Sequence, residues 1–133
     1  MRELRIQTER KTQLLELTEN LRPLLEGLEG SLVTLFVPHT TAGLVLQAAG
    51  PGATAVAGDL ESAFERLVDE GWSWEHVHEG DANPWSHVRT ALTASSISIP
   101  FVEGRLALGD HQAVFLAEFD GPRERSIYVT VTQ

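Results

Sequence analysis

The sequence contains no cysteine, so disulfides, thiolate metal ligands and a cysteine nucleophile are all excluded. Basic residues are also few: Lys and Arg number 10 against 19 Asp and Glu, and the formal net charge at pH 7 is −9. A charge of this sign disfavours non-specific binding to nucleic acid and to anionic membrane surfaces. We therefore expect neither nucleic acid nor a membrane among the partners of this protein.

Long apolar runs are missing as well. No segment approaches the roughly 20 apolar residues that a membrane-spanning helix needs. The first residues, MRELRIQTERK, are charged and alternating, unlike the apolar core of a secretory signal. We therefore expect a cytoplasmic protein. Its 133 residues predict one domain, 1–133, long enough to bury a core without disulfides or a structural metal.

The apolar pattern of the chain predicts an α+β fold. Alternating or continuous β-rich runs predict strands over about 2–8, 14–17, 31–37, 43–49, 96–100, 105–108, 112–119 and 126–132. Because the later runs follow one another through short turns, we expect mostly antiparallel pairing. Together with two to three helices, these strands predict a compact single-domain sandwich.

Helical spacing of apolar residues predicts the helices. Two of them are expected over about 19–27 and 51–69. Thr18 is the expected N-cap of the first. A third helix starts either at Asn83–Pro84 or at Ser86, and on either choice His87 falls in its first turn. The partial positive charge there disfavours an imidazolium ion, so we expect a neutral histidine able to act as ligand or base.

The stretch 74–87, WEHVHEGDANPWSH, concentrates the residue types that carry chemistry. It holds three of the five histidines, His76, His78 and His87, among carboxylates, and Gly and Pro interrupt it. Histidine and carboxylate side chains bind metals, transfer protons and hold polar ligands. Because loops of this kind commonly carry function, we expect the main site here.

A second segment supplies a further histidine. Pro38 ends a β-rich run, and His39 follows at the strand end. Neutral His39, His76 and His87 would fill three positions around a divalent metal such as zinc and leave one open for water or substrate. Their spacing matches no compact zinc motif. Two alternatives for His78 stay open: it pairs with His76 on an extended segment, or it is a solvated loop residue.

Two glutamates are candidate general acids or bases: Glu79 in the loop, and Glu118 in the apolar run AVFLAEF. An unpaired carboxylate is costly to bury, so Glu118 should have an arginine partner such as Arg105 or Arg123. Glu79 is otherwise a solvated loop charge. Neighbouring residues on a helix do not face one another, so we interpret Ser86 as a cap or hydrogen-bonding group rather than a nucleophile.

Three arginines, Arg105, Arg123 and Arg125, lie at turn edges in this acidic chain. A guanidinium group suits bidentate binding of phosphate or carboxylate. The residues alone fit ordinary surface charge equally well, so both interpretations stay open.

Several short runs, in the same order, resemble the YjbQ-like family of small uncharacterised proteins. The runs are FVPHTTAGL (36–44), WEHVHEG (74–80), SHVRTAL (86–92), GRLALG (104–109) and FLAEFDGPR (115–123). The resemblance implies a compact α+β sandwich and a homotrimer with sites near subunit boundaries. It also implies the family's provisional assignment as secondary thiamine-phosphate synthase, a weak activity that joins a thiazole phosphate to a pyrimidine diphosphate.

The resemblance also places individual residues. His39 stands at the histidine of the family's HT[ST]A run, and His76 and His87 stand at the two histidines that flank its EG loop. The predicted catalytic residues are His39, His76, His87, Glu79 and Glu118, the first three also being the predicted metal ligands. The predicted substrate-binding residues are Thr40, Thr41, Ser86, Arg105, Gln112 and Arg123.

One departure from the family pattern bears on function. Where the family usually has NEN, this chain has Gln47, Ala48 and Ala49, so a carboxylate that could bind a ligand or carry a proton is missing. The first hypothesis is an enzyme-like pocket protein that handles a phosphorylated small molecule, with zinc or magnesium as its divalent metal. The second is a non-catalytic ligand-binding or trimeric scaffold protein.

Overall fold

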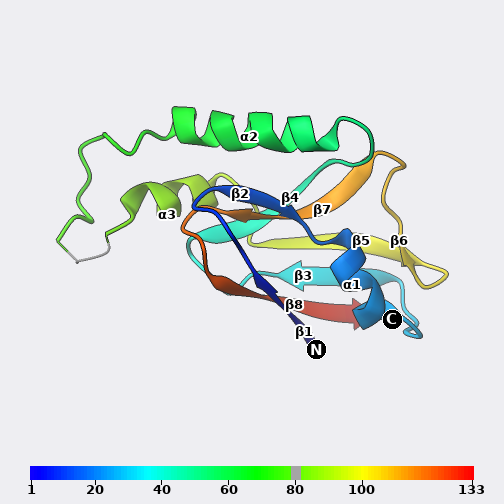
Figure 1. Ribbon diagram of the computed structural model, residues 1–133. Helices are drawn as coiled ribbons and strands as arrows, with labels where there is room; N and C mark the ends of the chain where they lie inside the picture. Colours follow the sequence, from blue (N-terminus) through cyan, green and yellow to red (C-terminus); the bar gives the residue numbers. More distant parts are fainter. Residues whose placement is uncertain (79–81) are drawn as a thin grey trace.

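The computed structural model describes residues 1–78 and 82–133 and has the predicted α+β architecture (Figure 1). The strands are β1 (Arg2–Gln7), β2 (Gln13–Glu16), β3 (Leu32–Phe36), β4 (Ala42–Ala48), β5 (Ser96–Val102), β6 (Arg105–Leu106), β7 (Gln112–Glu118) and β8 (Glu124–Thr132). The helices in these ranges are α1 (Thr18–Leu25), α2 (Ala53–Leu67) and α3 (Pro84–Ala91). None of these helices is long and apolar enough to cross a membrane.

Two sheets are stacked face to face. The larger has the strand order β1-β8-β3-β5-β6 and the smaller has the order β2-β7-β4. All pairings between these strands are antiparallel. The predicted antiparallel sandwich is therefore confirmed.

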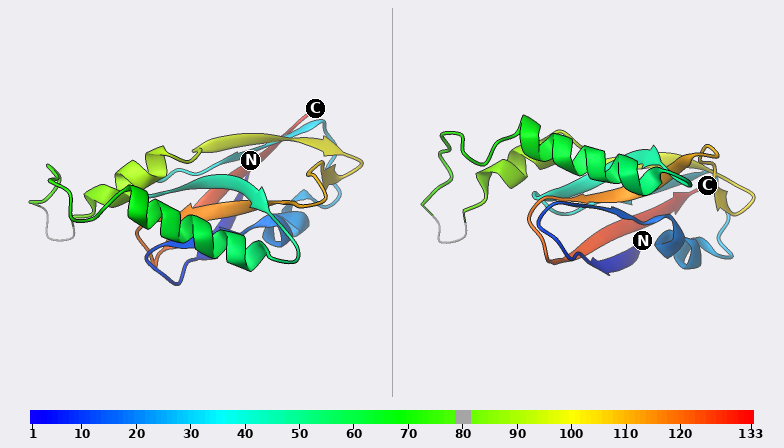
Figure 2. Two further views of the ribbon diagram at one scale, coloured as in Figure 1. Left: turned by 90° about the horizontal axis from the view of Figure 1, so that it is seen from above. Right: turned by 45° about the horizontal axis from the view of Figure 1, so that its top comes forward.

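Alternation along the strands builds the core between the sheets. On β3, Val33 and Leu35 are buried against the smaller sheet, whereas Phe36 is exposed on the other face. The outer face of the smaller sheet packs against α2, where the rings of Phe64 and Phe119 meet edge to face, 5.0 Å between centroids. Figure 2 shows α2 lying along this sheet. The molecule thus has three layers, with apolar side chains at both interfaces.

Three connections pass between the two sheets at the same end of the sandwich. In the larger sheet, Gln7 at the end of β1 pairs with Glu124 at the start of β8. In the smaller sheet, Glu118 at the end of β7 pairs with Gln13 and with Ala42, the first residues of β2 and β4. The segments brought together in this way are 8–12, 37–41 and 119–123. We call this place the crossover end.

Buried polar groups attach α3 to the crossover end. The hydroxyl of Ser86 donates to the carbonyl of Phe119 at 2.7 Å. Arg89, only 1% exposed, donates from Nη2 and Nε to the carbonyl of Val68 at 2.8 and 3.2 Å. Val68 directly follows α2, so Arg89 satisfies one of the carbonyls left open at a helix C-terminus. The Ser86 bond fixes the start of α3, and with it His87, next to the end of β7, and the Arg89 bonds connect α3 to the end of α2.

One capping prediction is wrong, and one open choice is decided. Thr18 begins α1 without capping it: Leu17 occupies the N-cap position, and the Thr18 hydroxyl accepts the N–H of Val114 at 3.0 Å. α3 begins directly after Asn83, so the alternative start at Ser86 is not used. In both places a tertiary hydrogen bond engages a hydroxyl that could otherwise cap a helix.

Candidate functional site

Two surface cavities differ in the chemistry of their linings. One, of about 670 Å³, lies between α1 and the β5–β6 turn, with leucines such as Leu25 and Leu106 in its lining. The other is a cleft of about 330 Å³ at the crossover end, lined by Pro38, His39, Thr40, Thr41, Asn83, His87, Asp120, Arg123 and Arg125. The smaller cavity gathers histidine, arginine and carboxylate groups suited to polar chemistry. We therefore take it as the candidate site and call it the crossover cleft.

His39 contributes a neutral ring to the crossover cleft. The backbone N–H of Ser126, on β8, donates to Nε2 of His39 at 2.9 Å. Burial lowers the pKa of His39, and the positive charge of Arg125 lowers it further. Because Nε2 accepts a hydrogen bond, the single proton of the neutral imidazole is on Nδ1. His39 therefore has one N–H, on Nδ1, for a ligand.

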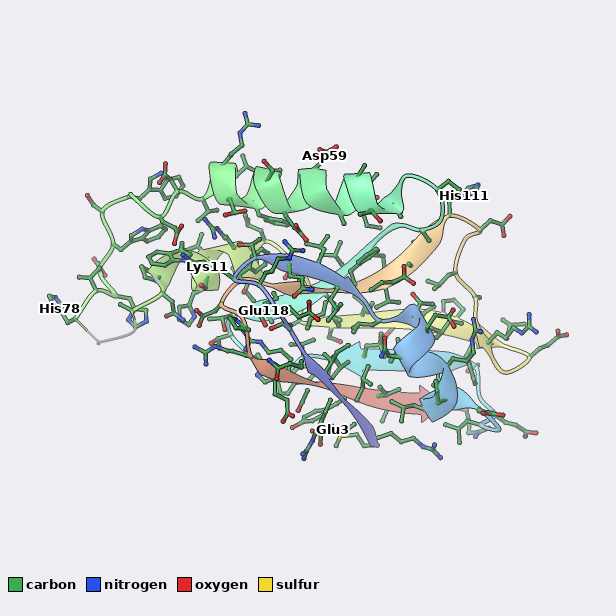
Figure 3. All side chains as sticks on the ribbon, in the orientation of Figure 1. Glu3, Lys11, Asp59, His78, His111 and Glu118 are labelled. Carbon is green, nitrogen blue, oxygen red and sulfur yellow. The ribbon has the colours of Figure 1, made fainter. Side chains whose placement is uncertain are left out.

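Glu118 lies fully buried inside the sandwich at the end of β7 (Figure 3), and four donors surround its carboxylate. Arg125 donates from Nε to Oε2 at 2.6 Å and from Nη2 to Oε1. Thr8 donates to Oε2 at 3.1 Å, and the backbone N–H of Asp120 donates to Oε1 at 2.9 Å. Since these donors engage both oxygens, the geometry makes Glu118 a support for Arg125.

The arginine partner expected for Glu118 is present, but it is neither Arg105 nor Arg123. It is Arg125, which is 4% exposed and shares the inward face of β8 with the buried Ile127. The turn over residues 119–123 joins the end of β7 directly to the start of β8, whereas Arg105 is in β6 at the opposite end of the sandwich.

The same contacts orient Arg125 in the crossover cleft. Its Nη2 also donates to the hydroxyl of Thr41 at 2.8 Å and, more weakly, to the Thr41 carbonyl at 3.3 Å. Within the described part of the chain, Nη1 has no hydrogen-bond partner. Because Arg125 lines the cleft, Nη1 is the N–H group left for an anionic ligand.

Arg123 is held by the turn that joins β7 to β8. Its Nη2 and Nε donate to Oδ2 and to the carbonyl of Asp120 at 2.7 and 2.9 Å. Its main chain exchanges two hydrogen bonds with Thr8. The turn needs glycine at Gly121, because a Cβ there would lie 2.2 Å from the backbone oxygen of Arg10. The Arg123 side chain is 47% exposed, so the cleft has one accessible and one buried guanidinium.

Of the three loop histidines, two lie at or beside the crossover cleft. His87 lines the cleft, and its ring centroid is 5.4 Å from that of His76. Nε2 of His76 is 3.2 Å from Oδ1 of Asn83. His78 is exposed at the outer end of the loop (Figure 3), in agreement with its interpretation as a solvated residue. Glu79 lies outside the described residues.

The geometry does not fit a three-histidine metal site. Across residues 1–78 and 82–133, no group of three or more His, Cys, Asp or Glu side chains is placed to hold a metal ion. A neutral imidazole has one lone pair to give to a metal. That of His39 already accepts the N–H of Ser126, and Nε2 of His76 bonds to Asn83. Zinc or magnesium binding stays a prediction for elemental analysis.

The remaining predicted ligand-binding residues are divided between the two ends of the sandwich. Thr40 and Thr41 line the crossover cleft. Arg105 lines the larger cavity, and the side chain of Gln112 accepts a backbone N–H of the turn before β7 at 3.0 Å. Gln112 pairs with Ala48 at the far end of β4, so the replaced NEN run lies there too. In one chain the predicted set therefore does not form a single site.

Besides Arg125, two polar residues of the cleft are outside the predicted site set, Asn83 and Asp120. They meet through a hydrogen bond from Asn83 Nδ2 to Asp120 Oδ2 at 2.5 Å, which joins the start of α3 to the β7–β8 turn. No local pattern signals such a contact. For Arg125 a signal exists, because its position continues the inward alternation of β8, with Ile127 and Val129, back to the strand start.

Comparison with known proteins places this arrangement in a family. The family model described as "UPF0047 protein YjbQ-like" matches residues 2–133. A UPF0047 protein of Archaeoglobus fulgidus is 32% identical over 127 residues, covering 96% of this chain and 97% of the relative. One of Synechocystis is 42% identical over 109 residues, covering 80% of this chain and 72% of the relative.

Solved structures agree with this family membership. A conserved hypothetical protein from Thermus thermophilus superposes with a TM-score of 0.85 at 34% identity, over 98% of this chain and 99% of that one. An uncharacterized protein of the YjbQ/UPF0047 family from Clostridium acetobutylicum gives a TM-score of 0.87 at 28% identity, again over 98% and 99%. The protein thus belongs to the UPF0047 family of YjbQ-like proteins.

Proposed function

We propose that this protein binds and handles a phosphorylated small molecule in the crossover cleft, in the cytoplasm. The observation that carries the proposal is the guanidinium of Arg125, whose orientation is fixed by hydrogen bonds to the buried Glu118 and to Thr41. Arg123 and the Nδ1–H of His39 add donors on the same cleft. Charge-assisted donors that are already oriented favour a phosphate group, because little conformational entropy is lost on binding.

The chemistry that suits this cleft is the departure of an anionic group. In the family's provisional activity, thiamine-phosphate synthesis, a diphosphate leaves. Its departure is helped by neutralising charge rather than by a nucleophile. The arginines and the His39 N–H supply such neutralisation, and His87 lies close enough to contact the ligand. Magnesium, which prefers oxygen ligands, would arrive with a diphosphate rather than bind to the imidazoles.

A homotrimer is part of this proposal. Arg105 and Gln112 lie away from the crossover cleft, so they can join it only if the far end of one subunit faces the cleft of the next. Apolar side chains on the helices support association: α2 has no fully buried residue in the single chain. Leu67 is 66% exposed and Leu92 is 59% exposed. Burial of such residues between subunits stabilises an oligomer.

Titration with inorganic phosphate and with a thiazole phosphate tests the ligand class. We expect Arg123→Gln to weaken binding about tenfold, since one charge-assisted contact is lost. Arg5→Gln is the matched control, because Arg5 is an exposed arginine paired with a carboxylate, as Arg123 is, and it lines neither cavity. Equal affinity of the two variants, or no binding of either ligand by the parent protein, would overturn the proposal.

Mixed oligomers test the subunit arrangement. We expect Arg105→Ala subunits alone and His87→Ala subunits alone to bind weakly or not at all. Refolded together, they should regain about a quarter to a third of the sites, because some boundaries then join an intact His87 of one subunit to an intact Arg105 of the next. Light scattering gives the number of subunits in the same samples. A monomer in solution, or no recovery in mixtures, contradicts the shared site.

The replaced NEN run favours a second candidate function, non-catalytic ligand binding or a trimeric scaffold. Ala48 stands where the family has a carboxylate, so a proton carrier is missing at the far end of β4. Turnover of a thiazole phosphate with a pyrimidine diphosphate separates the two candidates. Phosphate binding without turnover in the parent, together with turnover in Ala48→Glu, would favour the scaffold or binding role.

A further inference from the structure

A chain of hydrogen bonds links the loop before α3 to the β7–β8 turn across the crossover cleft. Nε2 of His76 meets Oδ1 of Asn83 at 3.2 Å, and Nδ2 of Asn83 donates to Oδ2 of Asp120 at 2.5 Å. The same Oδ2 accepts Nη2 of Arg123 at 2.7 Å. The side-chain amide of Asn83 therefore connects His76, in the loop before α3, to Asp120 and Arg123 in the β7–β8 turn.

The direction of every bond in this chain is fixed by chemistry. The Asp120 oxygen already accepts from an arginine, so it acts as an acceptor, and the Asn83 atom that meets it must be the amide nitrogen. The other end of the Asn83 amide is therefore the oxygen, which can only accept. It follows that Nε2 of His76 carries a proton whenever this bond is present.

The helix start supplies an independent observation. Asn83 occupies the N-cap position of α3, where asparagine normally accepts a backbone N–H of the first helical turn. Here its side chain makes no capping hydrogen bond. The amide is used instead for His76 and Asp120, which indicates that the contact across the cleft has displaced the usual helix cap.

We propose that Asn83 is a positioning residue of the crossover cleft, holding Nε2 of His76 protonated and coupling that histidine through Asp120 to Arg123. Nε2 of His76 is thereby excluded as a base or a metal ligand. Of the loop histidines, His87 lines the cleft beside His76 and is the one placed, together with His39, for contact with a ligand. The inference deepens the proposed function and rests on it only for the effect on ligand binding.

Nitrogen NMR of histidine-labelled full-length protein at alkaline pH tests the first half. Signals are assigned by their loss in His76→Asn. We expect a protonated Nε2 in the parent and in Asn83→Asp, which keeps the acceptor oxygen. Asn83→Leu should give a mixture of the two neutral ring forms. Asn83→Ser, a good helix cap that is too short to bridge, should behave like Asn83→Leu.

Inorganic phosphate titration of the same variants tests the coupling to Arg123. Asn83→Asp sets a second carboxylate beside Asp120, and we expect it to weaken phosphate binding about fivefold or more, a larger loss than in Asn83→Leu. An unprotonated Nε2 in the parent, an unchanged His76 spectrum in Asn83→Leu, or parent-like behaviour of Asn83→Ser would overturn the inference. Failure of the parent to bind phosphate would overturn the proposed function instead, and the NMR result would still decide the role of Asn83.

Discussion

Replacement of Glu118 by leucine tests how the crossover cleft is supported. Four donors lose their acceptor in this variant, and the guanidinium of Arg125, 4% exposed, keeps a buried charge with no carboxylate beside it. Breaking a buried ion pair from one side costs about 3–5 kcal/mol. We therefore expect Glu118→Leu to lower the free energy of unfolding by about this amount, a large share of the total stability of a domain.

The double variant Glu118→Leu with Arg125→Met separates support from simple packing. Removing both charges leaves no unpaired ion, so we expect it to be more stable than either single variant. Urea unfolding at one fixed protein concentration measures the three variants, because the stability of an oligomer depends on concentration. Glu19→Gln is the control: its pair with Arg22 is exposed, and its loss should change the stability by less than about 1 kcal/mol.

Two results would refute this reasoning. A loss below about 1 kcal/mol in Glu118→Leu would mean that the buried pair contributes no more than a surface pair. Additive losses in the double variant would mean that the two charges are not coupled. Loss of phosphate binding in the stable double variant would, in contrast, agree with the role given to Arg125.

Further predictions concern a histidine, a metal and a glycine. Because the pKa of His39 is lowered in the folded state, the unfolded chain protonates this histidine at a higher pH than the folded protein does. Folding stability should therefore fall as the pH drops below about 6.5 and level off once the pH has passed below the lowered pKa. His39→Gln should flatten a plot of unfolding free energy against pH. Elemental analysis of untagged protein should find less than one zinc per chain, unchanged in the His76→Ala, His87→Ala double variant. Stoichiometric metal that disappears in that variant would contradict this expectation, and it would be compatible with the His76–Asn83 hydrogen bond only through Nδ1 of His76. Gly121→Ala should lower the free energy of unfolding by about 2 kcal/mol or more, since its Cβ would lie 2.2 Å from a backbone oxygen. Gly58→Ala, in open space on α2, should raise the free energy of unfolding by up to about 1 kcal/mol. The same thermal scan measures both variants.

The strands were predictable because their signal is local. Val33 and Leu35 alternate with residues that face outward, and short turns between later strands imply antiparallel neighbours. The same local patterns gave the approximate limits of α2. Thr18 was misjudged because a threonine before an apolar helix is an ordinary cap, while the competing partner, the N–H of Val114, lies far away in sequence.

The candidate site was predictable only in part. His39 and His87 stand out by residue type. Glu118 was expected to have an arginine partner, because burying an unpaired carboxylate is costly. Which arginine pairs with it depends on how the β7–β8 turn passes from one sheet to the other, and local patterns do not specify that path. The separation of Arg105 from the cleft depends on the direction of β5 in the sheet, because Arg105 follows the C-terminal end of that strand.

The crossover end has a consequence for how a ligand affects folding. The Thr8–Glu118 and Arg125–Thr41 hydrogen bonds join segments that adjoin β1, β4, β7 and β8, so the cleft is complete only when both sheets are in place. A ligand then binds the native state alone, and at a concentration 100 times its Kd it would add about 2.7 kcal/mol to the free energy of unfolding. A rise in melting temperature can therefore serve as a screen for the natural ligand, since whatever fits the cleft should protect the entire chain.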